Sequence, residues 1–450
     1  MRRIMIAGTE SGAGKTTITL AIMAALIKKG WKVQGFKCGP DYIDPAFHTE
    51  VTGRPSRNLD SWMLNKSTLL DVFHHGMQGA DIAVIEGVMG LFDGKNPFNN
   101  EGSTAEISSL TKTPVLLCLD CWAMGRSAAA VVKGFQSFDS TVKIGGVIVN
   151  KAAGEGHYQM IKTAVEKECG LPVIGYFPND LELSMPERHL GLVQAAENQD
   201  LAALFNKLAE QALKTINLDL LFEISQKGNF PAEKSIFTCK KEPLAAIAVA
   251  RDKAFSFYYE ENLELLEACG AKILPFSPLE GEKVPSGAAG IYLGGGYPEI
   301  FANELSNAKE TIASIKQAYE KGMPILAECG GFMYLTEELE TAEGQVYKMA
   351  GLIPGRAKME KQLQALGYLE AAGLEGSTLL PEGMAIRGHV YHHSQYEGPS
   401  KKAAYKIKES PAGFTQKNLM AGYAHFHFAS NPEFPQNFVG LCLKAAGKEV

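Results

Sequence analysis

A cysteine between a predicted strand and a predicted helix is the residue most clearly suited to covalent chemistry. The run Pro-Ile-Leu-Ala-Glu-Cys-Gly-Gly-Phe-Met-Tyr-Leu at 324–335 predicts a strand, a sharp turn at Cys329 and a helix. The two glycines permit the strained turn that exposes a nucleophile. Because helix N–H dipoles favour the thiolate, the pKa of Cys329 is expected to be lowered. We therefore predict that Cys329 is a nucleophile for acyl transfer.

Two other segments carry the groups that such a nucleophile needs. His425 and His427 alternate in a strand-like run. Side chains two apart on a strand share a face, so the spacing leaves both histidines as candidate bases. A run of three glycines follows another predicted strand upstream. The N–H groups of Gly295, Gly296 and Gly330 are predicted to stabilise an oxyanion.

A second histidine cluster, Arg-Gly-His-Val-Tyr-His-His-Ser at 387–394, allows three interpretations. On a helix, His389 and His393 would be spaced to bind a metal together. The intervening Val390 and Tyr391 favour a strand instead. Contact with a substrate and packing in the core are the other two interpretations, and the sequence leaves them open.

A glycine-rich loop near the start of the chain predicts a phosphate site. Residues 4–17, Ile-Met-Ile-Ala-Gly-Thr-Glu-Ser-Gly-Ala-Gly-Lys-Thr-Thr, read as a strand, a turn and the first turn of a helix. Glycines let backbone N–H groups approach phosphate oxygens, while the lysine and the helix N-terminus add positive charge. The residues predicted to bind a nucleotide here are Gly12, Gly14, Lys15, Thr16 and Thr17, and the Thr16 hydroxyl is predicted to ligate Mg²⁺.

This loop departs from the standard pattern at one position. Thr9 stands where the pattern has its first glycine, and Gly8 lies one residue earlier. Partition and switch ATPases, the obvious rivals, typically carry an extra lysine where this chain has Glu10. The absence of that lysine counts against a switch ATPase.

Acidic residues follow two other predicted strands of the first half. Glu86 ends an apolar run, and Lys37, Asp41 and Asp44 follow the strand before it. The carboxyl ends of parallel strands meet at one edge of a sheet, where carboxylates can hold Mg²⁺. Each acid alone could be a helix cap, but their common position favours a metal-nucleotide site, with Lys37 contacting the nucleotide.

The pattern of elements predicts an α/β protein of two domains. Short apolar runs alternate with amphipathic helices in the first half, which indicates a doubly wound, mainly parallel sheet. Residues 216–243 lose clear periodicity and are predicted to be a linker, after which a second α/β series begins. We predict domain boundaries at 1–235 and 243–450.

The bulk composition excludes several classes of protein. A net charge of -6 argues against sequence-independent nucleic-acid binding, which needs a basic surplus. No apolar run reaches the length of a membrane span, and the first residues read as a strand and not as a signal peptide. Eight scattered cysteines are expected to be reduced thiols, and the pair Cys118 and Cys121, at the end of an apolar run, is expected to be buried. These features predict a cytoplasmic protein.

Taken together, the motifs resemble those of the cobyrinic acid a,c-diamide synthase family across essentially the whole chain. The resemblance rests on their order and spacing, in the phosphate loop and in segments 37–45, 86–94, 186–192, 294–299, 328–332, 387–394 and 423–428. It implies an ATP domain like dethiobiotin synthetase joined to a class I glutamine amidotransferase domain. The implied ligase reaction, in cobalamin biosynthesis, is the amidation of the a and c carboxylates of cobyrinate through acyl phosphates.

The resemblance also implies roles for residues of the thiol site. Cys329 would attack glutamine and release ammonia, and His425 matches the catalytic histidine of the family. Many class I enzymes have a glutamate two residues after that histidine, where this chain has His427. A Cys329–His425 dyad is therefore expected.

In the ATP domain, the resemblance assigns Lys15, Thr16, Asp41 and Glu86 to ATP and Mg²⁺. Tyr42 and Asp93 are expected to serve the acceptor acid. The implied partners are small molecules, namely a corrinoid acid, glutamine and ATP, and a homodimer is compatible with the resemblance. Two alternatives are a sister enzyme acting on another tetrapyrrole acid, as in nickel-sirohydrochlorin or cobyric acid synthesis, and a P-loop regulatory ATPase.

Overall fold

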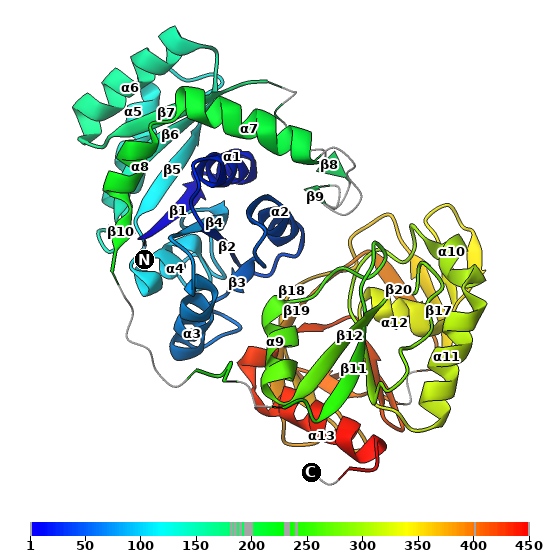
Figure 1. The fold of residues 1–450 in the computed structure, drawn as a ribbon. Helices are drawn as coiled ribbons and strands as arrows, with labels where there is room; N and C mark the ends of the chain where they lie inside the picture. Colours follow the sequence, from blue (N-terminus) through cyan, green and yellow to red (C-terminus); the bar gives the residue numbers. More distant parts are fainter. Residues whose placement is uncertain are drawn as a thin grey trace. The chain divides into compact units, whose positions relative to one another are not determined.

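A computed structural model describes residues 2–180, 183, 187–188, 191–192, 201–228, 235–238, 242–399 and 402–448. The chain forms two compact units, Met1–Ser235 and Ile236–Val450, shown in Figure 1. Among the described residues, no helix is both long and apolar enough to cross a bilayer. The units are described one at a time below.

The first unit is built on a sheet in the order β3-β2-β4-β1-β5-β6-β7, with β10 beside β1. All neighbours in this order are parallel, and β10 is antiparallel to β1. Aliphatic runs buried on both faces form the central strands, as expected for a covered parallel sheet. The strands are β1 (Arg2–Gly8), β2 (Val33–Cys38), β3 (Arg57–Leu59), β4 (Ile82–Gly90), β5 (Val115–Asp120), β6 (Ile144–Ala152), β7 (Val173–Pro178) and β10 (Gln226–Lys227).

The strand order determines which helices cover which face. The connections β1–β2 and β2–β3 run one way along the sheet, and the later ones run the other way. Because such crossovers are right-handed, α1 and α2 cover one face and α3 to α6 cover the other. Helix α7 packs on α1. The helices are α1 (Lys15–Lys28), α2 (Ile43–Thr52), α3 (Lys66–Met77), α4 (Thr104–Thr111), α5 (Ser127–Phe138), α6 (Glu155–Cys169), α7 (Leu201–Thr215) and α8 (Leu218–Ile224).

The predicted doubly wound sheet is thus confirmed, whereas the predicted linker at 216–243 is wrong over its first part. Helix α8 and strand β10 occupy that part, and Leu221 is buried in the core against α1 and β7. A helix of seven residues is too short to show a clear period in the sequence. Residues 229–234 and 239–241 of the predicted linker lie outside the described residues.

The motif at 186–192 is described only in part, as the short strands β8 (Glu187–Arg188) and β9 (Gly191–Leu192). Residues 186, 189 and 190 lie outside the described residues. The expected burial of the thiols Cys118 and Cys121 is confirmed, since both are fully buried and free. Burial raises the pKa of each to about 12.

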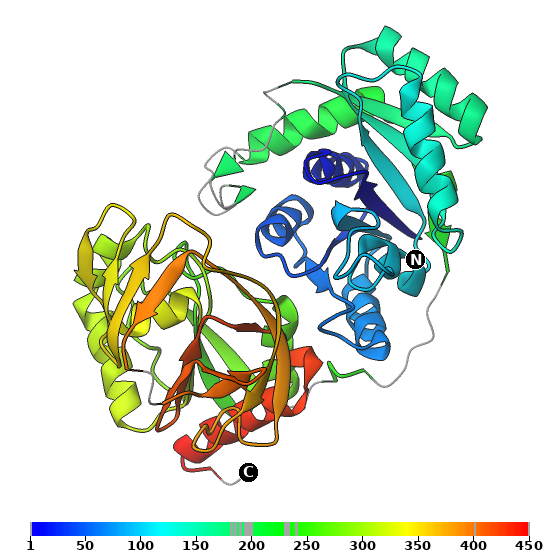
Figure 2. The ribbon, with the colours of Figure 1, turned by 180° about the vertical axis from the view of Figure 1, so that it is seen from behind.

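The second unit has a central sheet in the order β12-β11-β13-β14-β24-β23, parallel except for the pair β23–β24. Helix α13, at the end of the chain, packs against α9, β11 and β13 (Figures 1 and 2). The strands of the central sheet are β11 (Ala245–Ala250), β12 (Ala271–Phe276), β13 (Gly290–Leu293), β14 (Ile325–Glu328), β23 (Phe414–Gln416) and β24 (Leu419–Gly422). The helices are α9 (Glu260–Ala268), α10 (Ala302–Asn307), α11 (Lys309–Glu320), α12 (Gly330–Leu335) and α13 (Glu433–Ala445).

Two smaller sheets complete this unit, in the orders β16-β15-β17-β20 and β22-β21-β18-β19-β25. They account for the strand-rich character of the late sequence. Their strands are β15 (Thr336–Glu340), β16 (Val346–Lys348), β17 (Ile353–Met359), β18 (Ala365–Gly373), β19 (Ala385–His392), β20 (Ser394–Glu397), β21 (Tyr405–Ile407), β22 (Ser410–Ala412) and β25 (His425–Phe426).

Candidate functional site

Cys329 lies at a strained turn between β14 and α12. Its backbone has φ 45° and ψ -101°, a left-handed conformation that costs about 1–3 kcal/mol in a residue other than glycine. The Cys329 N–H donates to the Gly422 carbonyl at 2.7 Å, which fixes the turn against β24. A β-carbon on Gly331 would lie 2.3 Å from the Leu293 carbonyl oxygen, so the turn requires glycine there. The predicted elbow is therefore present.

The expected low pKa of this thiol is not found. Burial raises the pKa of Cys329 to about 12, and the negative charge of Glu299 raises it further. The Gly330 N–H bonds to the sulfur and lowers the pKa, but by less. Because Cys329 is only 7 % exposed, loss of hydration outweighs the dipoles of the six-residue helix α12. The thiol therefore needs a base at the moment of reaction.

His425 lies against the glycine turn that follows β13. A β-carbon on Gly295 would be 2.4 Å from Cε1 of His425, so only a glycine leaves room for the ring. A β-carbon on Gly330 would lie 3.0 Å from the Gly296 nitrogen. The structure therefore brings the elbow, the glycine turn and His425 into one cluster, which we call the thiol site.

His427, the other candidate base, faces a different environment. Its ring packs on Tyr259 with the centroids 4.6 Å apart. The side chain is fully buried, and neither ring nitrogen has a hydrogen-bond partner within the described part of the chain. Tertiary packing thus distinguishes two histidines that the sequence spacing left equivalent.

The three predicted oxyanion donors differ in what they contact. The Gly295 N–H donates to the Phe257 carbonyl at 3.3 Å, which differs from the prediction that it faces an oxyanion. The Gly330 N–H points to the Cys329 sulfur, and the Gly296 nitrogen lies beside Gly330. Gly296 and Gly330 therefore lie beside each other at the elbow.

The second histidine cluster lies on strand β19, so the helical metal-binding interpretation of His389 and His393 is wrong. His389 stacks on His425, with ring centroids 5.0 Å apart and an angle of 15° between the planes. The Tyr259 hydroxyl lies 2.9 Å from its Nδ1 atom. Burial lowers the pKa of His389 to about 3, so it is a neutral ring packed against the candidate base.

In the first unit, the phosphate loop has the shape that its glycines predict. Gly12 and Gly14 have φ of 80° and 89°, in the left-handed region that favours glycine. The Lys15 ammonium folds back over the loop and donates to the Glu10 carbonyl at 3.0 Å. Lys15, Thr16 and Thr17 open helix α1. Loop amides, a helix N-terminus and a lysine are thus gathered as a phosphate site requires.

A buried cluster of charged groups lies beside this loop. The Lys37 ammonium is 2.5 Å from Asp44 Oδ2 and 2.9 Å from Glu86 Oε1. The Thr16 hydroxyl donates to Glu86 Oε1 at 2.6 Å and lies 3.4 Å from Asp44. Lys37 and Glu86 are register neighbours on β2 and β4, as expected for strands that end at one edge. We call Thr16, Lys37, Asp44 and Glu86 the acid cluster.

The charges in this cluster are strongly coupled. Burial raises the pKa of Asp44 well above its usual range, and the neighbouring Glu86 charge adds to the effect. Burial also disfavours the Glu86 carboxylate, but Lys37 and His48 outweigh it and hold the pKa of Glu86 below its usual range. Glu86 is therefore the ionised carboxylate, and Asp44 is the carboxyl group that takes up a proton more readily.

Of the two acids that follow β2, Asp44 is the one that contacts the Thr16 hydroxyl. Asp41 Oδ1 accepts the N–H groups of Ile43 and Asp44, at 2.8 and 3.2 Å, and so caps helix α2, while its Oδ2 atom lies 3.8 Å from the Lys37 ammonium. His48 was not predicted from the sequence, and its Nε2 lies 2.8 Å from Glu86 Oε2. Asp44 and His48 are four residues apart on α2, a helical spacing that could have indicated a shared face.

The acid cluster suits Mg²⁺ when a nucleotide is bound. Its hydroxyl and carboxylate oxygens are the hard ligands that this ion prefers, and a cation, the Lys37 ammonium, already lies among them. No group of three His, Cys, Asp or Glu side chains able to hold a metal occurs in the described ranges. A nucleotide site does not need such a group of three side chains, because Mg²⁺ there binds one or two carboxylates together with phosphates and water.

The two residues predicted to serve the acceptor acid lie near strand ends. Tyr42 precedes helix α2 and is partly exposed. Asp93 is exposed, and its Oδ2 atom accepts the Gly90 N–H at 2.9 Å, which closes the turn after β4. Both are accessible to a ligand.

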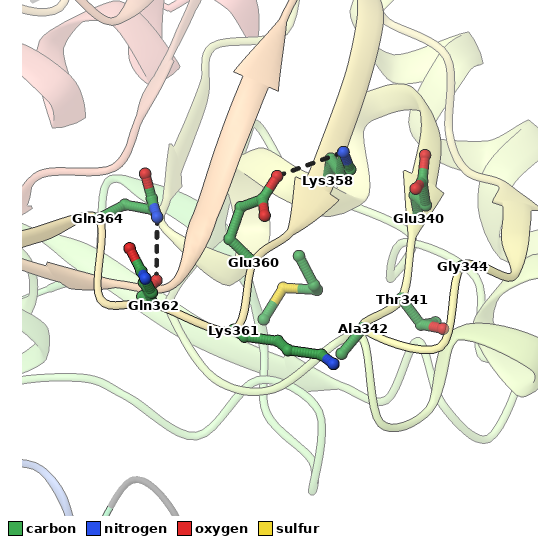
Figure 3. A pocket seen from close by; sticks show the side chains of 10 residues that line it. Glu340, Thr341, Ala342, Gly344, Lys358, Glu360, Lys361, Gln362 and Gln364 are labelled. Carbon is green, nitrogen blue, oxygen red and sulfur yellow. Dashed lines mark hydrogen bonds and ion pairs between the residues drawn. The ribbon is translucent and has the colours of Figure 1, made fainter.

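A pocket of about 340 Å³ in the second unit is separate from the thiol site (Figure 3). It lies between loops of the smaller sheets, where Lys358 pairs with Glu360 at 3.3 Å and Gln364 donates to the Gln362 carbonyl at 3.0 Å. None of its lining residues is one predicted to act in catalysis. This pocket is therefore not made of residues predicted to carry the chemistry.

Comparison with protein families agrees with this division into two sites. Residues 4–193 match the CobQ/CobB/MinD/ParA nucleotide binding domain, which contains the phosphate loop and the acid cluster. Residues 246–433 match the CobB/CobQ-like glutamine amidotransferase domain, which contains Cys329 and His425. The two-domain α/β fold expected from the sequence is thereby confirmed.

Three full-length relatives share one name, cobyrinate a,c-diamide synthase. The protein of Priestia megaterium is 49% identical, over 100% of this chain and 98% of its own. That of Listeria innocua is 44% identical, over 98% of this chain and 99% of its own. That of Dehalococcoides mccartyi strain 195 is 43% identical, over 97% of each chain. The chain therefore belongs to the cobyrinate a,c-diamide synthase family.

Proposed function

We propose that this chain catalyses the ATP- and glutamine-dependent amidation of the a and c carboxylates of cobyrinate. The observation that carries the proposal is the presence, in one chain, of a strained cysteine elbow and a phosphate loop beside buried acids. Amide formation needs both, because nitrogen must be released from glutamine and a carboxylate oxygen must be activated. The identity of the acceptor rests on the shared name of the relatives.

In the glutamine reaction, the Cys329 sulfur attacks the side-chain amide carbon while His425 takes the thiol proton. Burial lowers the pKa of His425 well below its usual range, so the ring is neutral and can accept that proton. The proton then passes to the leaving nitrogen, ammonia departs, and a thioester to Cys329 forms. Water hydrolyses the thioester to glutamate. The N–H groups of Gly296 and Gly330 are our candidates for the oxyanion hole.

In the ATP reaction, an oxygen of the acceptor carboxylate attacks the γ-phosphorus, and ADP leaves. Ammonia adds to the acyl carbon of the resulting acyl phosphate, and inorganic phosphate leaves with the activated oxygen. The phosphate loop and Lys37 would bind the phosphates of ATP. Mg²⁺, held by Thr16, Asp44 and Glu86, would supply neutralisation of the phosphate charge. We assign Tyr42 and Asp93 to the acceptor acid.

Free thiols and the use of ATP lead us to assign the enzyme to the cytoplasm. The test is incubation of the purified chain with cobyrinate, Mg-ATP and glutamine labelled at its amide nitrogen, followed by chromatography and mass spectrometry. We expect a doubly amidated product that carries two labelled nitrogens. Glutamate release without amidation of cobyrinate would contradict the proposed acceptor and direct the assay to other tetrapyrrole acids. Absence of both reactions from folded, ATP-binding protein would contradict the proposal as a whole.

A further inference from the structure

The residue just before the nucleophile, Glu328, is buried and contacts the strand that carries His425. Glu328 is 1 % exposed and lies at the end of β14. Its Oε1 atom accepts the Phe426 N–H at 3.0 Å, and its Oε2 atom accepts the Tyr292 hydroxyl at 2.7 Å. A carboxyl group buried this deeply is costly unless it is hydrogen-bonded, and each of its two oxygens accepts one hydrogen bond here. The reaction proposed above does not use it.

The Phe426 peptide is held from its other side as well. Asn262, a fully buried residue of helix α9, donates from Nδ2 to the Phe426 carbonyl at 2.7 Å. The Oδ1 atom of Asn262 accepts the Phe428 N–H at 2.7 Å. Strand β25, which contains only His425 and Phe426, is therefore fixed by side chains from β14 and α9 in addition to its pairing with β19.

We infer that Glu328 is a positioning residue, which holds His425 in reach of Cys329 by fixing the main chain of its neighbour Phe426. This inference rests on the proposed glutamine reaction. Many class I amidotransferases orient the histidine with a glutamate two residues later, and His427 occupies that position here. In this chain, Glu328 and Asn262 act on the backbone of β25 instead. Because Glu328 is joined to Cys329 by one peptide bond, nucleophile and base share one anchor.

The inference depends on the reach of the Glu328 side chain and not on its ability to ionise, which two conservative variants separate. Glu328→Gln keeps the reach and an oxygen acceptor for the Phe426 N–H but cannot ionise. Glu328→Asp keeps an ionisable carboxyl group but draws it back by one methylene. A matched control is Glu337→Gln: Glu337 also accepts a backbone N–H, from Gly355 at 2.9 Å, but it is exposed and lies on β15.

The experiment measures glutamate release and ammonia-dependent amidation in the full chain. For Glu328→Asp we expect kcat of glutamine hydrolysis to fall by about 100-fold with KM nearly unchanged, as a ~1 Å misplacement of a catalytic group does. Glu328→Gln and Glu337→Gln should stay within about threefold of the parent, and all variants should keep amidation with free ammonia. The positioning role would be overturned if Glu328→Asp and Glu328→Gln hydrolysed glutamine with equal kcat, or if Glu328→Gln had the lower kcat. A parent chain without glutaminase activity would instead overturn the proposed function.

Discussion

Gly14 lies so close to Asn150 that a β-carbon at Gly14 would be 2.0 Å from the amide nitrogen of Asn150. That nitrogen also donates to the Ala13 carbonyl at 2.9 Å, which fixes the phosphate loop to strand β6. Gly12 has a similar positive φ, of 80°, but its β-carbon would have nothing within 4 Å. A side chain at the two loop glycines would thus meet different obstacles, a steric clash at Gly14 and only backbone strain at Gly12.

This difference predicts the effects of two alanine substitutions. Gly14→Ala should displace Asn150 and the loop, and we expect ATP-dependent amidation to fall by about 100-fold or more. Gly12→Ala meets only the strain of its backbone, about 1–2 kcal/mol, and should retain most of the activity. Steady-state kinetics with ammonia as the nitrogen donor isolates this half of the reaction. Equal loss in both variants would contradict the steric argument, and glutamate release should persist in both.

The division of labour predicts the behaviour of Cys329→Ala. Without the thiol no thioester forms, so we expect glutamine-dependent amidation to vanish while free ammonia still supports it. The measurement is amidation of cobyrinate with each nitrogen donor in turn. Cys269→Ala is the matched control, because Cys269 is a partly exposed thiol at the end of α9. Equal loss with both donors would contradict two separate half-reactions.

The contacts of the two histidines predict which one is the base. His425→Ala should lower kcat of glutamine hydrolysis by about 100- to 10,000-fold, the usual contribution of a general base. His427→Phe should leave kcat within about tenfold, because His427 packs on Tyr259 and makes no side-chain hydrogen bond among the described residues. The rate at which a reagent specific for Cys329 reacts should likewise be lowered more in His425→Ala than in His427→Phe. Greater loss in His427→Phe than in His425→Ala would reverse the assignment.

Buried titratable groups predict how the stability of the second unit depends on pH. Burial lowers the pKa of His389 and His427 from 6.5 to about 3, so each of these histidines binds a proton in the unfolded chain that it lacks in the folded chain in that window. Their contribution to stability therefore rises with pH there. Burial raises the pKa of Glu328 from 4.5 to about 8, so the folded chain holds a proton that the unfolded chain has lost. Stability therefore falls from pH 6.5 to 8, by on the order of 1 kcal/mol per pH unit. We expect maximal stability near pH 6.5.

Calorimetry of the full chain can measure this dependence. The three tryptophans, Trp31, Trp62 and Trp122, all lie in the first unit. A calorimetric unfolding transition during which the tryptophan fluorescence does not change is therefore that of the second unit. In Glu328→Gln the fall in stability above pH 6.5 should disappear, while the rise in stability with pH at lower pH should persist. Rising stability between pH 6.5 and 8 in the parent chain would contradict the assignment.

Several parts of the site could be predicted because they depend on local backbone geometry. The elbow at Cys329 and the loop at Gly12 and Gly14 need glycine within a few residues, so the sequence shows them directly. The sequence also showed that Glu86 lies on a strand of this sheet, although β4 continues beyond it to Gly90 and does not end there as predicted. By contrast, Asp41 and Asp44 look alike in sequence, and only the direction of helix α2 decides which is a cap and which faces Thr16.

The sequence by itself determined the two α/β units, the phosphate loop, the cysteine elbow and the family, since these depend on periodicity and on short runs of fixed residue type. Only the tertiary structure decided that His425 and not His427 faces the glycine turn, and that Glu328 holds its strand. It also overturned the expected low pKa of Cys329. The physical reason is the same in each case: burial and side-chain contacts between distant segments depend on packing, and a local sequence pattern does not encode them.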